Sequence, residues 1–413
     1  IIKLDSFGNV FSSKNTIMPY RSTPPPSIYT SKIIVDNSNN IIVIGTIYDE
    51  FVTDSMSYQF NGGSSMFIQK LTNNGELIWM KVFHNSINDY LADVEINTNN
   101  QLFLTGSFKG SIDFGNAIPI NANGLEDIFI LKLDSNGHVL NAKSYGGTKG
   151  DYGMQLELAN NKIFLCGSYT DTLNFDQFTI NSGINPNGYL ASFNDNLETQ
   201  WVRSIGDDSY NYNYSLKVDD LGNLFTIGIF TDSINIEGNM FYGLGSNSYF
   251  QKFNSEGNHL WSNIISKNFT NYSDIWLDFE LDHNQNQYFS GIYKDSISFN
   301  LPYFQENLYG KSSRSSFIVK FSNSTVSNIL GNFDKKDLKI YPNPTSNQFT
   351  IEGLSSKSTL FIYNTIGKKM LEKSLSAKHE VSININYLEN GIYYYHINSN
   401  NTDFNYIGKI IKR

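Results

Sequence analysis

The sequence contains a single cysteine, Cys166, which excludes an intrachain disulfide and any metal cluster built on cysteines. Charged residues are sparse, at 17%, and no apolar run approaches the roughly 20 residues that a membrane-spanning helix needs. Lys and Arg number 30 against 39 Asp and Glu. The net charge of -9 argues against nucleic acid or an anionic membrane as the main partner.

Motifs of catalysis are also missing. The sequence has no H-E-x-x-H, no G-x-S-x-G, no P-loop and no Rossmann fingerprint. Its six histidines lie far apart, mostly beside turn residues. Cys166 lies in an apolar run beside Gly167, which favours a buried, inert thiol over a nucleophile. We therefore predict no catalytic residue, no metal site and no cofactor.

The residues that do dominate favour strands. Tyr, Phe, Ile, Thr, Ser, Asn and Gly are abundant, while the helix formers Ala and Glu are scarce. Hydrophobic residues make up 40% of the chain, with 30 Phe and 26 Tyr, which is enough for a sizeable core and excludes wholesale disorder. Short alternating runs are broken by Asn, Asp and Gly. This pattern predicts an all-β protein.

The chain repeats with a period near 61 residues. One anchor is a glycine that closes an apolar strand, and its spacings are 61, 61, 61 and 63 residues. The five anchor glycines are Gly45, Gly106, Gly167, Gly228 and Gly291. A second anchor is a lysine between them, replaced by Ser192 in one copy. These lysines are Lys3, Lys70, Lys132, Lys252 and Lys320.

Tryptophan follows the lysine position by nine residues in three copies, at Trp79, Trp201 and Trp261. Asn141 and Ser12 take its place in two others. A strand position that recurs in every copy is expected to pack against the next copy, so we interpret both series as structural. One ligand pocket would not need five copies of a residue.

Each period contains four strand-like pieces. In the third full copy they are Asp151–Ala159, Lys162–Tyr169, Gly188–Asn194 and Thr199–Gly206. Tight Asn, Asp and Gly turns join them, and these residues tolerate the positive φ of short hairpins. Four antiparallel strands per repeat predict a β-propeller of four-stranded blades, with five full repeats and a partial N-terminal one.

These segments resemble the SBBP-type β-propeller repeat of bacterial secreted proteins, over residues 1–330. The matching patterns are D-x-F-I-x-K-L-D-x-x-G-x-x-x-W and G-x-F/Y-x-D-S-I-x-F. The resemblance implies a fold more firmly than a function. Residues 1–18 match only the third and fourth strands of a blade, which predicts that the array is N-terminally incomplete.

Two groups of polar and aromatic residues are candidates for binding. An aspartate recurs at Asp49, Asp171, Asp232 and Asp295; it could bind Ca²⁺, although capping of a turn is the simpler interpretation. Tyr210, Tyr212 and Tyr214 alternate with Asn and Asp, which suits stacking on sugar rings and hydrogen bonding to hydroxyls. An ordinary loop leading into a strand is the alternative for these tyrosines.

The tail forms a separate unit. After a linker at residues 331–337 the repeat pattern ends, and residues 338–413 are mildly basic where the preceding array is strongly acidic. Pro342 and Pro344 exclude a helix at the start of the tail. Six or seven short strands follow, which predict a small Ig-like β-sandwich.

The tail resembles the type A C-terminal sorting domain, or Por secretion tail, of the type IX secretion system of Bacteroidetes. The resemblance rests on residues in the family's order, namely Tyr341, Pro342, Asn343, Pro344, Gly367, Gly391, Tyr393, Lys409 and Lys412. It implies export across the outer membrane through the translocon, with the protein released or held on the cell surface. We also expect a side chain at Gly391 to crowd the backbone.

The sequence therefore predicts a secreted or cell-surface β-propeller that binds a glycan or a protein and is not an enzyme. One alternative is an extracellular hydrolase or lyase that acts on polysaccharide, with its site in the propeller funnel. The other is a structural spacer without a ligand. The choice of ligand rests on analogy of fold alone.

Overall fold

The computed structural model describes residues 2–4, 10–13, 27–48, 51–52, 57–58, 64–84, 89–116, 118–206, 209–267, 276–282, 284–293, 296–301, 304–309, 315–321, 339–354, 357–364, 369–376, 380–399 and 405–413. These residues form strands, turns and connecting segments only, so the chain is all-β as predicted. The chain folds into two compact units, Ile1–Phe321 and Ser322–Arg413.

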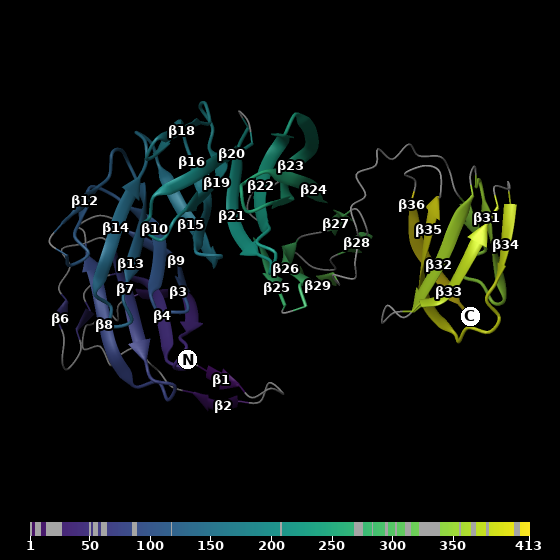
Figure 1. Cartoon of the computed structure of the whole chain (residues 1–413), viewed down its shortest axis with the longest axis horizontal. Coiled ribbons are helices and arrows are strands. Elements are labelled where there is room, and N and C mark those ends of the chain that lie inside the picture. The colour runs from purple at the N-terminus through teal and green to yellow at the C-terminus, as the bar shows by residue number, and fades with distance from the viewer. Residues whose placement is uncertain are drawn as a thin grey trace. The chain divides into compact units, whose positions relative to one another are not determined.

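The first unit contains a series of antiparallel sheets, one for each sequence repeat (Figure 1). The first sheet comprises β3 (Ser27–Val35), β4 (Ile41–Tyr48), β7 (Ser64–Leu71) and β8 (Leu77–His84). The second comprises β9 (Tyr90–Ile96), β10 (Leu102–Phe108), β13 (Asp127–Leu133) and β14 (Val139–Tyr145). The third comprises β15 (Asp151–Ala159), β16 (Lys162–Tyr169), β19 (Asn187–Phe193) and β20 (Thr199–Ile205), within one residue of the predicted strands.

The fourth and fifth sheets continue the series. The fourth comprises β21 (Asn211–Val218), β22 (Leu224–Ile236), β23 (Asn239–Phe253) and β24 (His259–Lys267), and it continues into β27 (Ser296–Leu301) and β28 (Phe304–Tyr309) of the fifth copy, because β24 pairs with β27. The fifth comprises β25 (Trp276–Leu281), β26 (Gln287–Tyr293) and β29 (Ser315–Phe321). Upstream, β1 (Ile2–Leu4) pairs with β2 (Val10–Ser13). These are the two strands that the sequence pattern predicts for residues 1–18.

Each copy also has strand pairing that the sequence analysis did not predict, between its second and third strands. The added hairpins are β5 (Phe51–Val52) with β6 (Ser57–Tyr58), β11 (Ser111–Ile112) with β12 (Ile120–Asn121), β17 (Thr172–Phe175) with β18 (Phe178–Asn181), and β27 (Ser296–Leu301) with β28 (Phe304–Tyr309). In the fourth copy β22 and β23 are long enough to include it. Leu173 and Phe175 of β17 are fully buried, so this hairpin contributes to the core.

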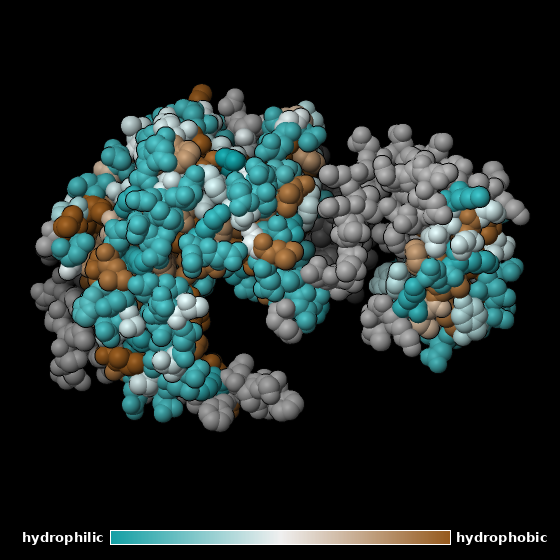
Figure 2. Space-filling model, in the orientation of Figure 1, coloured by the Kyte–Doolittle hydropathy of each residue, from teal (hydrophilic) through white to brown (hydrophobic). Residues whose placement is uncertain are grey.

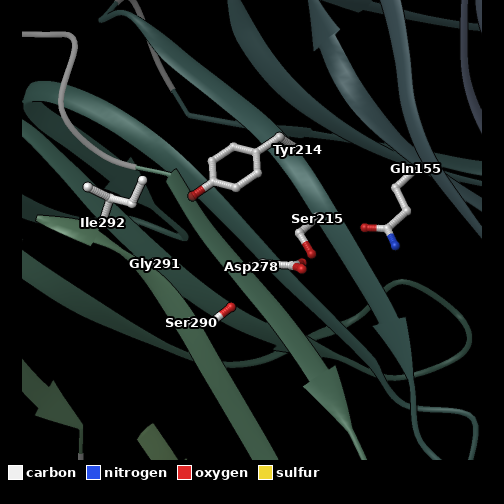
Figure 3. A pocket seen from close by; sticks show the side chains of 7 residues that line it. All are labelled: Gln155, Tyr214, Ser215, Asp278, Ser290, Gly291 and Ile292. Atoms are coloured by element: carbon white, nitrogen blue, oxygen red, sulfur yellow. The ribbon is translucent and has the colours of Figure 1, made fainter. Parts of the chain in front are cut away.

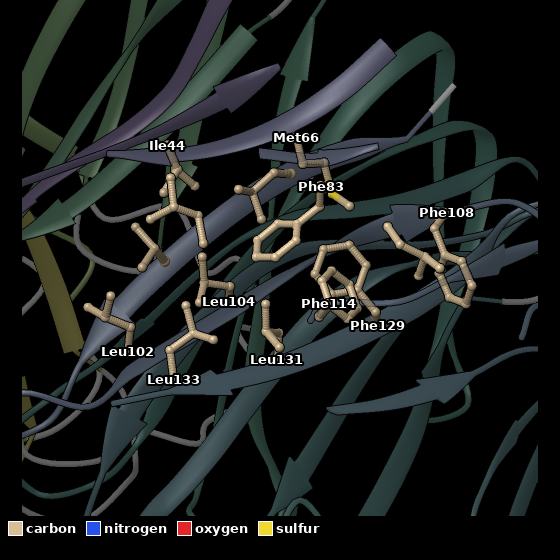
Figure 4. Packing of buried hydrophobic residues seen from close by; sticks show 14 of the residues in the cluster. Ile44, Met66, Phe83, Leu102, Leu104, Phe108, Phe114, Phe129, Leu131 and Leu133 are labelled. Atoms are coloured by element: carbon tan, nitrogen blue, oxygen red, sulfur yellow. The ribbon is translucent and has the colours of Figure 1, made fainter. Parts of the chain in front are cut away.

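The apolar core lies between successive sheets. Figure 4 shows the cluster between the first and second sheets, where Ile44 and Met66 meet Leu104 and Phe129. Equivalent clusters join the second sheet to the third, the third to the fourth and the fourth to the fifth. Because the middle strands are covered on both faces, every residue of β10 and β13 is buried.

The anchor glycine is required by the close approach of two neighbours. A Cβ at Gly167 would lie 1.9 Å from the Tyr152 carbonyl oxygen of the first strand and 2.8 Å from the Tyr189 ring of the third. The same positions crowd Gly45, Gly106 and Gly228. Only glycine leaves room for both neighbours, which explains why the residue recurs in register.

The tryptophan series joins each copy to the next. Trp79 Nε1 donates a hydrogen bond to the Ser135 carbonyl oxygen at 3.3 Å, and Trp201 Nε1 donates to that of Ser255 at 3.1 Å. Asn141, which replaces tryptophan in the second copy, donates from Nδ2 to the Asn196 carbonyl oxygen at 2.9 Å. The substitution therefore keeps the bond to the following copy, and the structural interpretation of this series is confirmed.

The lysine series has a structural role as well. Lys70 Nζ lies 2.9 Å from an Asp36 carboxylate oxygen, and Lys252 Nζ lies 3.3 Å from one of Asp219. Each aspartate belongs to the turn between the first two strands of the same sheet. The Asp36 carboxylate also accepts hydrogen bonds from the backbone N–H groups of Ser38 and Asn40, which close the turn. Lys70 therefore neutralises the charge of a carboxylate that already holds the turn together.

The repeated aspartate occupies a left-handed turn. Its φ is 68° at Asp171 and 64° at Asp232, and Gly110, which replaces it in the second copy, has a φ of 75°. Aspartate and glycine both tolerate this conformation, which supports the turn interpretation over a Ca²⁺ ligand. Asp49 and Asp295 lie outside the described residues. Cys166 is fully buried, as predicted, and burial raises the pKa of its thiol far above its ordinary value.

The second unit contains two sheets. One comprises β30 (Lys339–Tyr341), β31 (Gln348–Glu352) and β34 (Glu380–Asn384). The other comprises β32 (Ser358–Asn364), β33 (Lys369–Leu375), β35 (Gly391–Ser399) and β36 (Asn405–Lys412). Phe349 and Ile383 from the first sheet share one core with Leu360 and Ile410 from the second. This unit thus has its own apolar core. The predicted linker at residues 331–337 lies outside the described residues.

Candidate functional site

The first candidate site lies at one edge of the tail, where segments from both of its ends meet. Asn343 Nδ2 donates a hydrogen bond to the Lys409 carbonyl oxygen at 2.6 Å, and Asn343 Oδ1 accepts the Ile411 N–H at 2.9 Å. Both bonds tie the segment Tyr341–Pro344, which contains two cis prolyl peptide bonds, to β36. The structure therefore brings together residues that are 66 and 68 positions apart.

The predicted C-terminal residues lie on the two paired strands of this edge. Gly391 and Lys412 are register partners, and Tyr393 pairs with Ile410. The Lys412 ammonium donates to the Arg413 carbonyl oxygen at 3.1 Å, and the Tyr393 hydroxyl donates to the Glu389 carbonyl oxygen at 2.9 Å. Tyr393 and Lys412 are buried, whereas Tyr341, Ile392, Tyr394 and Lys409 are exposed. Gly367 lies outside the described residues.

The expected crowding at Gly391 is wrong. A Cβ at this position would meet only the Tyr393 ring, at 4.0 Å, which is an ordinary van der Waals contact. Gly391 begins a strand at the edge of the domain, where its backbone has no close neighbour on that side. The anchor glycines of the repeats, by contrast, do have such close neighbours.

The second candidate site lies on the first strands of the repeat sheets, β3, β9, β15, β21 and β25. These strands contact one another in succession, and we refer to them as the first-strand row (Figure 1). In four copies the carbonyl that approaches the anchor glycine belongs to a tyrosine, namely Tyr29, Tyr90, Tyr152 or Tyr212. Trp276 has the same register in the fifth copy, one residue before the partner of Gly291. We call the four tyrosines the tyrosine row.

Exposure differs along the tyrosine row. Tyr29 is 63% exposed, Tyr90 45% and Tyr212 36%, whereas Tyr152 is half-buried. The face shown in Figure 2 is mainly hydrophilic, with apolar residues in small separate groups. Tyr29, Tyr90 and Tyr212 thus present aromatic side chains to solvent.

Only part of the predicted Tyr210, Tyr212 and Tyr214 group lies in the tyrosine row. Tyr212 belongs to it, and the adjacent Tyr210 is 52% exposed. Tyr214 is half-buried at an irregularity in the β21–β22 register, and it packs against the core between the fourth and fifth sheets. Sequence analysis missed Tyr29, Tyr90 and Tyr152. Aligning the copies on the anchor glycine and reading 15 or 16 residues upstream would have found them.

Tyr152 connects neighbouring copies. Its hydroxyl donates a hydrogen bond to the Glu126 carboxylate at 3.3 Å, from the third copy to the second. Burial, the Glu126 charge and the nearby Tyr212 raise the pKa of Tyr152. Burial and the adjacent Tyr210 likewise raise the pKa of Tyr212. Tyr212 therefore lies close enough to both Tyr152 and Tyr210 to interact with them electrostatically.

Charged residues occupy the other end of the same strands. Lys32 Nζ lies 2.7 Å from Asp93 and 2.6 Å from Glu95, and Lys217 Nζ lies 3.0 Å from Glu157 and 2.9 Å from Glu280. Burial raises the pKa of Asp93 to about 6, although the Lys32 charge opposes this. Burial also raises the pKa of Glu157, against the attraction of Lys217. The first-strand row thus has an aromatic end and an ion-paired end.

A cavity of about 350 Å³ opens beside these strands (Figure 3). It is lined by Gln155, Tyr214, Ser215, Asp278, Ser290, Gly291 and Ile292, from β15, β21, β25 and β26. Figure 3 shows the polar ends of Ser215 and Asp278 near its centre. The lining offers hydroxyl, amide and carboxylate groups for hydrogen bonds to a small polar molecule.

Within the described ranges, no three His, Cys, Asp or Glu side chains are grouped so that they could hold a metal ion. No helix of the described chain is long and apolar enough to cross a membrane.

The tail matches a known protein family. Residues 339–413 match the family described as the secretion system C-terminal sorting domain. The chain therefore carries a C-terminal sorting domain of the type IX secretion system, which implies export to the cell surface or release. No curated protein matches the chain.

Several solved structures are distantly similar to the whole chain. PorZ of Porphyromonas gingivalis, described as a bacterial surface component of the type IX secretion system, is 12% identical with a TM-score of 0.36. The match covers 98% of this chain and 48% of PorZ, so the chain spans about half the length of that protein.

Two further structures give weaker likenesses. A Bacteroides caccae protein of unknown function is 9% identical over 78% of this chain and 90% of its own, with a TM-score of 0.32. A glycoside hydrolase of family 32 from Bifidobacterium adolescentis is 7% identical over 93% and 76%, with a TM-score of 0.33. All of these TM-scores lie below 0.5.

Proposed function

We propose that the chain is an exported β-propeller that binds a glycan or a protein at the surface of a Bacteroidetes cell, and that it is not an enzyme. Residues 1–330 form the propeller array, built from SBBP-type repeats, and residues 331–337 form a linker. Residues 338–413, an Ig-like sandwich, present the sorting residues to the type IX translocon. The tyrosine row and Tyr210 provide the binding surface.

The observation that carries this proposal is the sorting-domain match at residues 339–413. A protein with this tail functions outside the cell, where glycans and proteins of other cells are the available ligands. The repeated sheets supply a rigid array, and the exposed tyrosines supply flat aromatic faces with hydroxyl groups. The ion pairs on the same strands leave Lys32 and Lys217 engaged with carboxylates rather than free for an anionic ligand.

Secretion tests the first half of the proposal. The full chain and a form ending at residue 321 would each be given a Sec signal and expressed in a host with a type IX secretion system. Full-length protein is expected in the medium or on the surface, and the truncated form inside the cell. Equal export of both forms would contradict the sorting role.

A second candidate function is hydrolysis or cleavage of a polysaccharide in the funnel. The observation in its favour is the pair of buried carboxyl groups with raised pKa, Asp93 and Glu157, since a general acid needs a pKa near neutrality. Each of them is ion-paired to a lysine, as expected for a structural group. Release of reducing ends by the wild type, lost in Glu157→Gln, would favour the enzyme. Failure to bind or cleave any ligand would favour a spacer.

A further inference from the structure

The tyrosine row contains a residue type that the close approach to the anchor glycine does not require. What the anchor glycine needs from this position is the backbone carbonyl, which any residue could supply. The side chain is nevertheless tyrosine in four consecutive copies, while the position of Trp79 is occupied by Asn141 in the next copy. Three of the four rings are at least 36% exposed.

An exposed aromatic side chain that binds nothing reduces the stability and the solubility of a protein. It gives up the burial free energy that makes aromatic residues valuable in a core, and it favours self-association. Tyr189 and Tyr249, on the third strands, show the contrasting case. Both are fully buried, and their hydroxyls donate to the carbonyl oxygens of Tyr152 and Tyr212 at 3.1 and 3.2 Å. The buried tyrosines have structural roles, whereas Tyr29, Tyr90 and Tyr212 present their rings to solvent.

We infer that the tyrosine row binds a linear, uncharged polysaccharide, with successive sugar units stacked on tyrosines of successive copies. This inference rests on the proposed binding function and assigns its ligand class. A repeated ring on contacting strands suits a ligand that itself repeats, because each copy meets an equivalent sugar unit. The apolar face of a sugar ring stacks on the tyrosine, and its hydroxyls find acceptors such as the Glu126 carboxylate beside Tyr152.

Charge selects against acidic ligands. The protein has a net charge of -9, and carboxylates Glu95, Glu126 and Glu157 lie on or beside the first-strand row. The lysines on these strands are already paired with carboxylates. A uronate polymer or a nucleic acid would meet repulsion here, while a neutral glycan would not.

Affinity electrophoresis of the full chain tests the inference. The probes are hydroxyethyl cellulose, β-1,4-mannan, β-1,3-glucan and soluble starch as neutral polymers, with polygalacturonate as an acidic polymer and gelatin as a polypeptide. The variants are Tyr29→Ala, Tyr90→Ala and Tyr212→Ala, alone and combined. Tyr242→Ala is the matched control, because Tyr242 is 77% exposed on β23, outside the tyrosine row.

At least one neutral polymer is expected to retard the wild type, and polygalacturonate is not. Each single variant should weaken binding about 3- to 10-fold, and the triple variant should abolish it. Tyr90→Phe, which keeps the ring, should bind within about 3-fold of the wild type. Tyr242→Ala should be unchanged. Thermal unfolding of every variant confirms that the fold is intact.

Other outcomes overturn the inference in distinguishable ways. Retardation by a neutral polymer that is unaffected in the triple variant would leave the proposed function standing and remove the tyrosine row from it. Retardation by gelatin alone, lost in the triple variant, would make the ligand a polypeptide. Retardation by none of the probes would contradict both the inference and the glycan part of the proposed function.

Discussion

Asp93 Oδ2 accepts a hydrogen bond from the backbone N–H of Leu156, 63 residues later in the chain, at 2.9 Å. Gln155 Oε1 accepts the Leu216 N–H in the same way, 61 residues later and also at 2.9 Å. The first strand is the edge of each repeat sheet, so its outer N–H groups have no strand partner. A side chain of the preceding copy supplies the missing acceptor.

Replacing Gln155 by leucine should therefore destabilise the array. The Leu216 N–H would be left without its acceptor in a buried position, at a cost of about 1–3 kcal/mol. Gln155→Glu keeps the acceptor and serves as the control. The measurement is urea unfolding of the full chain; equal midpoints for Gln155→Leu and the wild type would show that this bond adds nothing.

Trp201→Ala should lower the unfolding free energy by roughly 3–5 kcal/mol, the usual penalty for truncating a large buried aromatic side chain. Trp201 is 9% exposed, packs on Phe164 and donates to the Ser255 carbonyl oxygen. Calorimetry or denaturant unfolding checks the value. A loss below about 1 kcal/mol would mean that Trp201 is not part of the joint between the third and fourth copies.

Gly167→Ala should be among the most damaging single substitutions in the chain, costing about 3 kcal/mol or more through overpacking. Its Cβ would overlap the Tyr152 carbonyl oxygen, which is backbone and cannot move aside. Gly391→Ala is the matched control, with its nearest neighbour at 4.0 Å. Similar yields and melting temperatures for the two variants would refute the explanation of the anchor glycine.

Buried aspartates predict a dependence of stability on pH. Asp127 and Asp151 are both fully buried, at positions held in the next copy by Asn187 and Asn211. Asn211 Nδ2 donates to Asn187 Oδ1 at 3.1 Å, a bond that two charged carboxylates could not make. Burial, together with the Asp127 charge, raises the pKa of Asp151 to about 7, although the Gly147 N–H opposes this.

Between pH 4 and pH 7 the folded protein binds a proton at Asp151 that the unfolded chain has lost. The unfolding free energy should therefore fall as the pH rises through this window, by up to roughly 4 kcal/mol, and level off above it. Asp151→Asn should reduce this slope, leaving the part that Asp93 and Glu157 contribute through their own raised pKa values, whereas Asp220→Asn, at an exposed position, should keep it in full. A wild-type melting temperature that rises across the window would contradict the prediction.

Asn343→Ala should reduce export several-fold while leaving the repeat array folded. The substitution removes both hydrogen bonds that tie the start of the tail to β36, each worth about 1 kcal/mol. Gly391→Ala is expected to be exported normally. The ratio of secreted to cell-retained protein measures the effect; normal export of Asn343→Ala would show that this edge is not needed by the translocon.

The fold was largely predictable because its signal is repetitive and local. Alternation of apolar residues and Asn, Asp and Gly turns placed the strands Asp151–Ala159 and Lys162–Tyr169 without error. The added hairpins were missed, because strands such as Ser111–Ile112 have only two residues and show no period. Gly391 was misjudged, since crowding depends on neighbours that sequence does not reveal.

The candidate site was harder to predict. The alternation of Tyr210, Tyr212 and Tyr214 predicts that the three side chains bind a ligand together. A register irregularity instead places Tyr214 against the core. Tyr29 and Tyr90 stand alone in their segments, and the strand pairing shows that they share a position with Tyr212. The Asp93–Leu156 bond links a side chain to a backbone group, which leaves no signal in residue types.

The joints between copies have a consequence for how such a protein changes over generations. Along the first four copies, a Trp or Asn side chain of one copy donates a hydrogen bond to a turn carbonyl of the next copy. A duplicated copy would bring both halves of its joints with it, and a deleted copy would leave two compatible neighbours. Recombination between repeats can thus lengthen or shorten the array in whole steps, and the number of tyrosines available to a ligand would change with it.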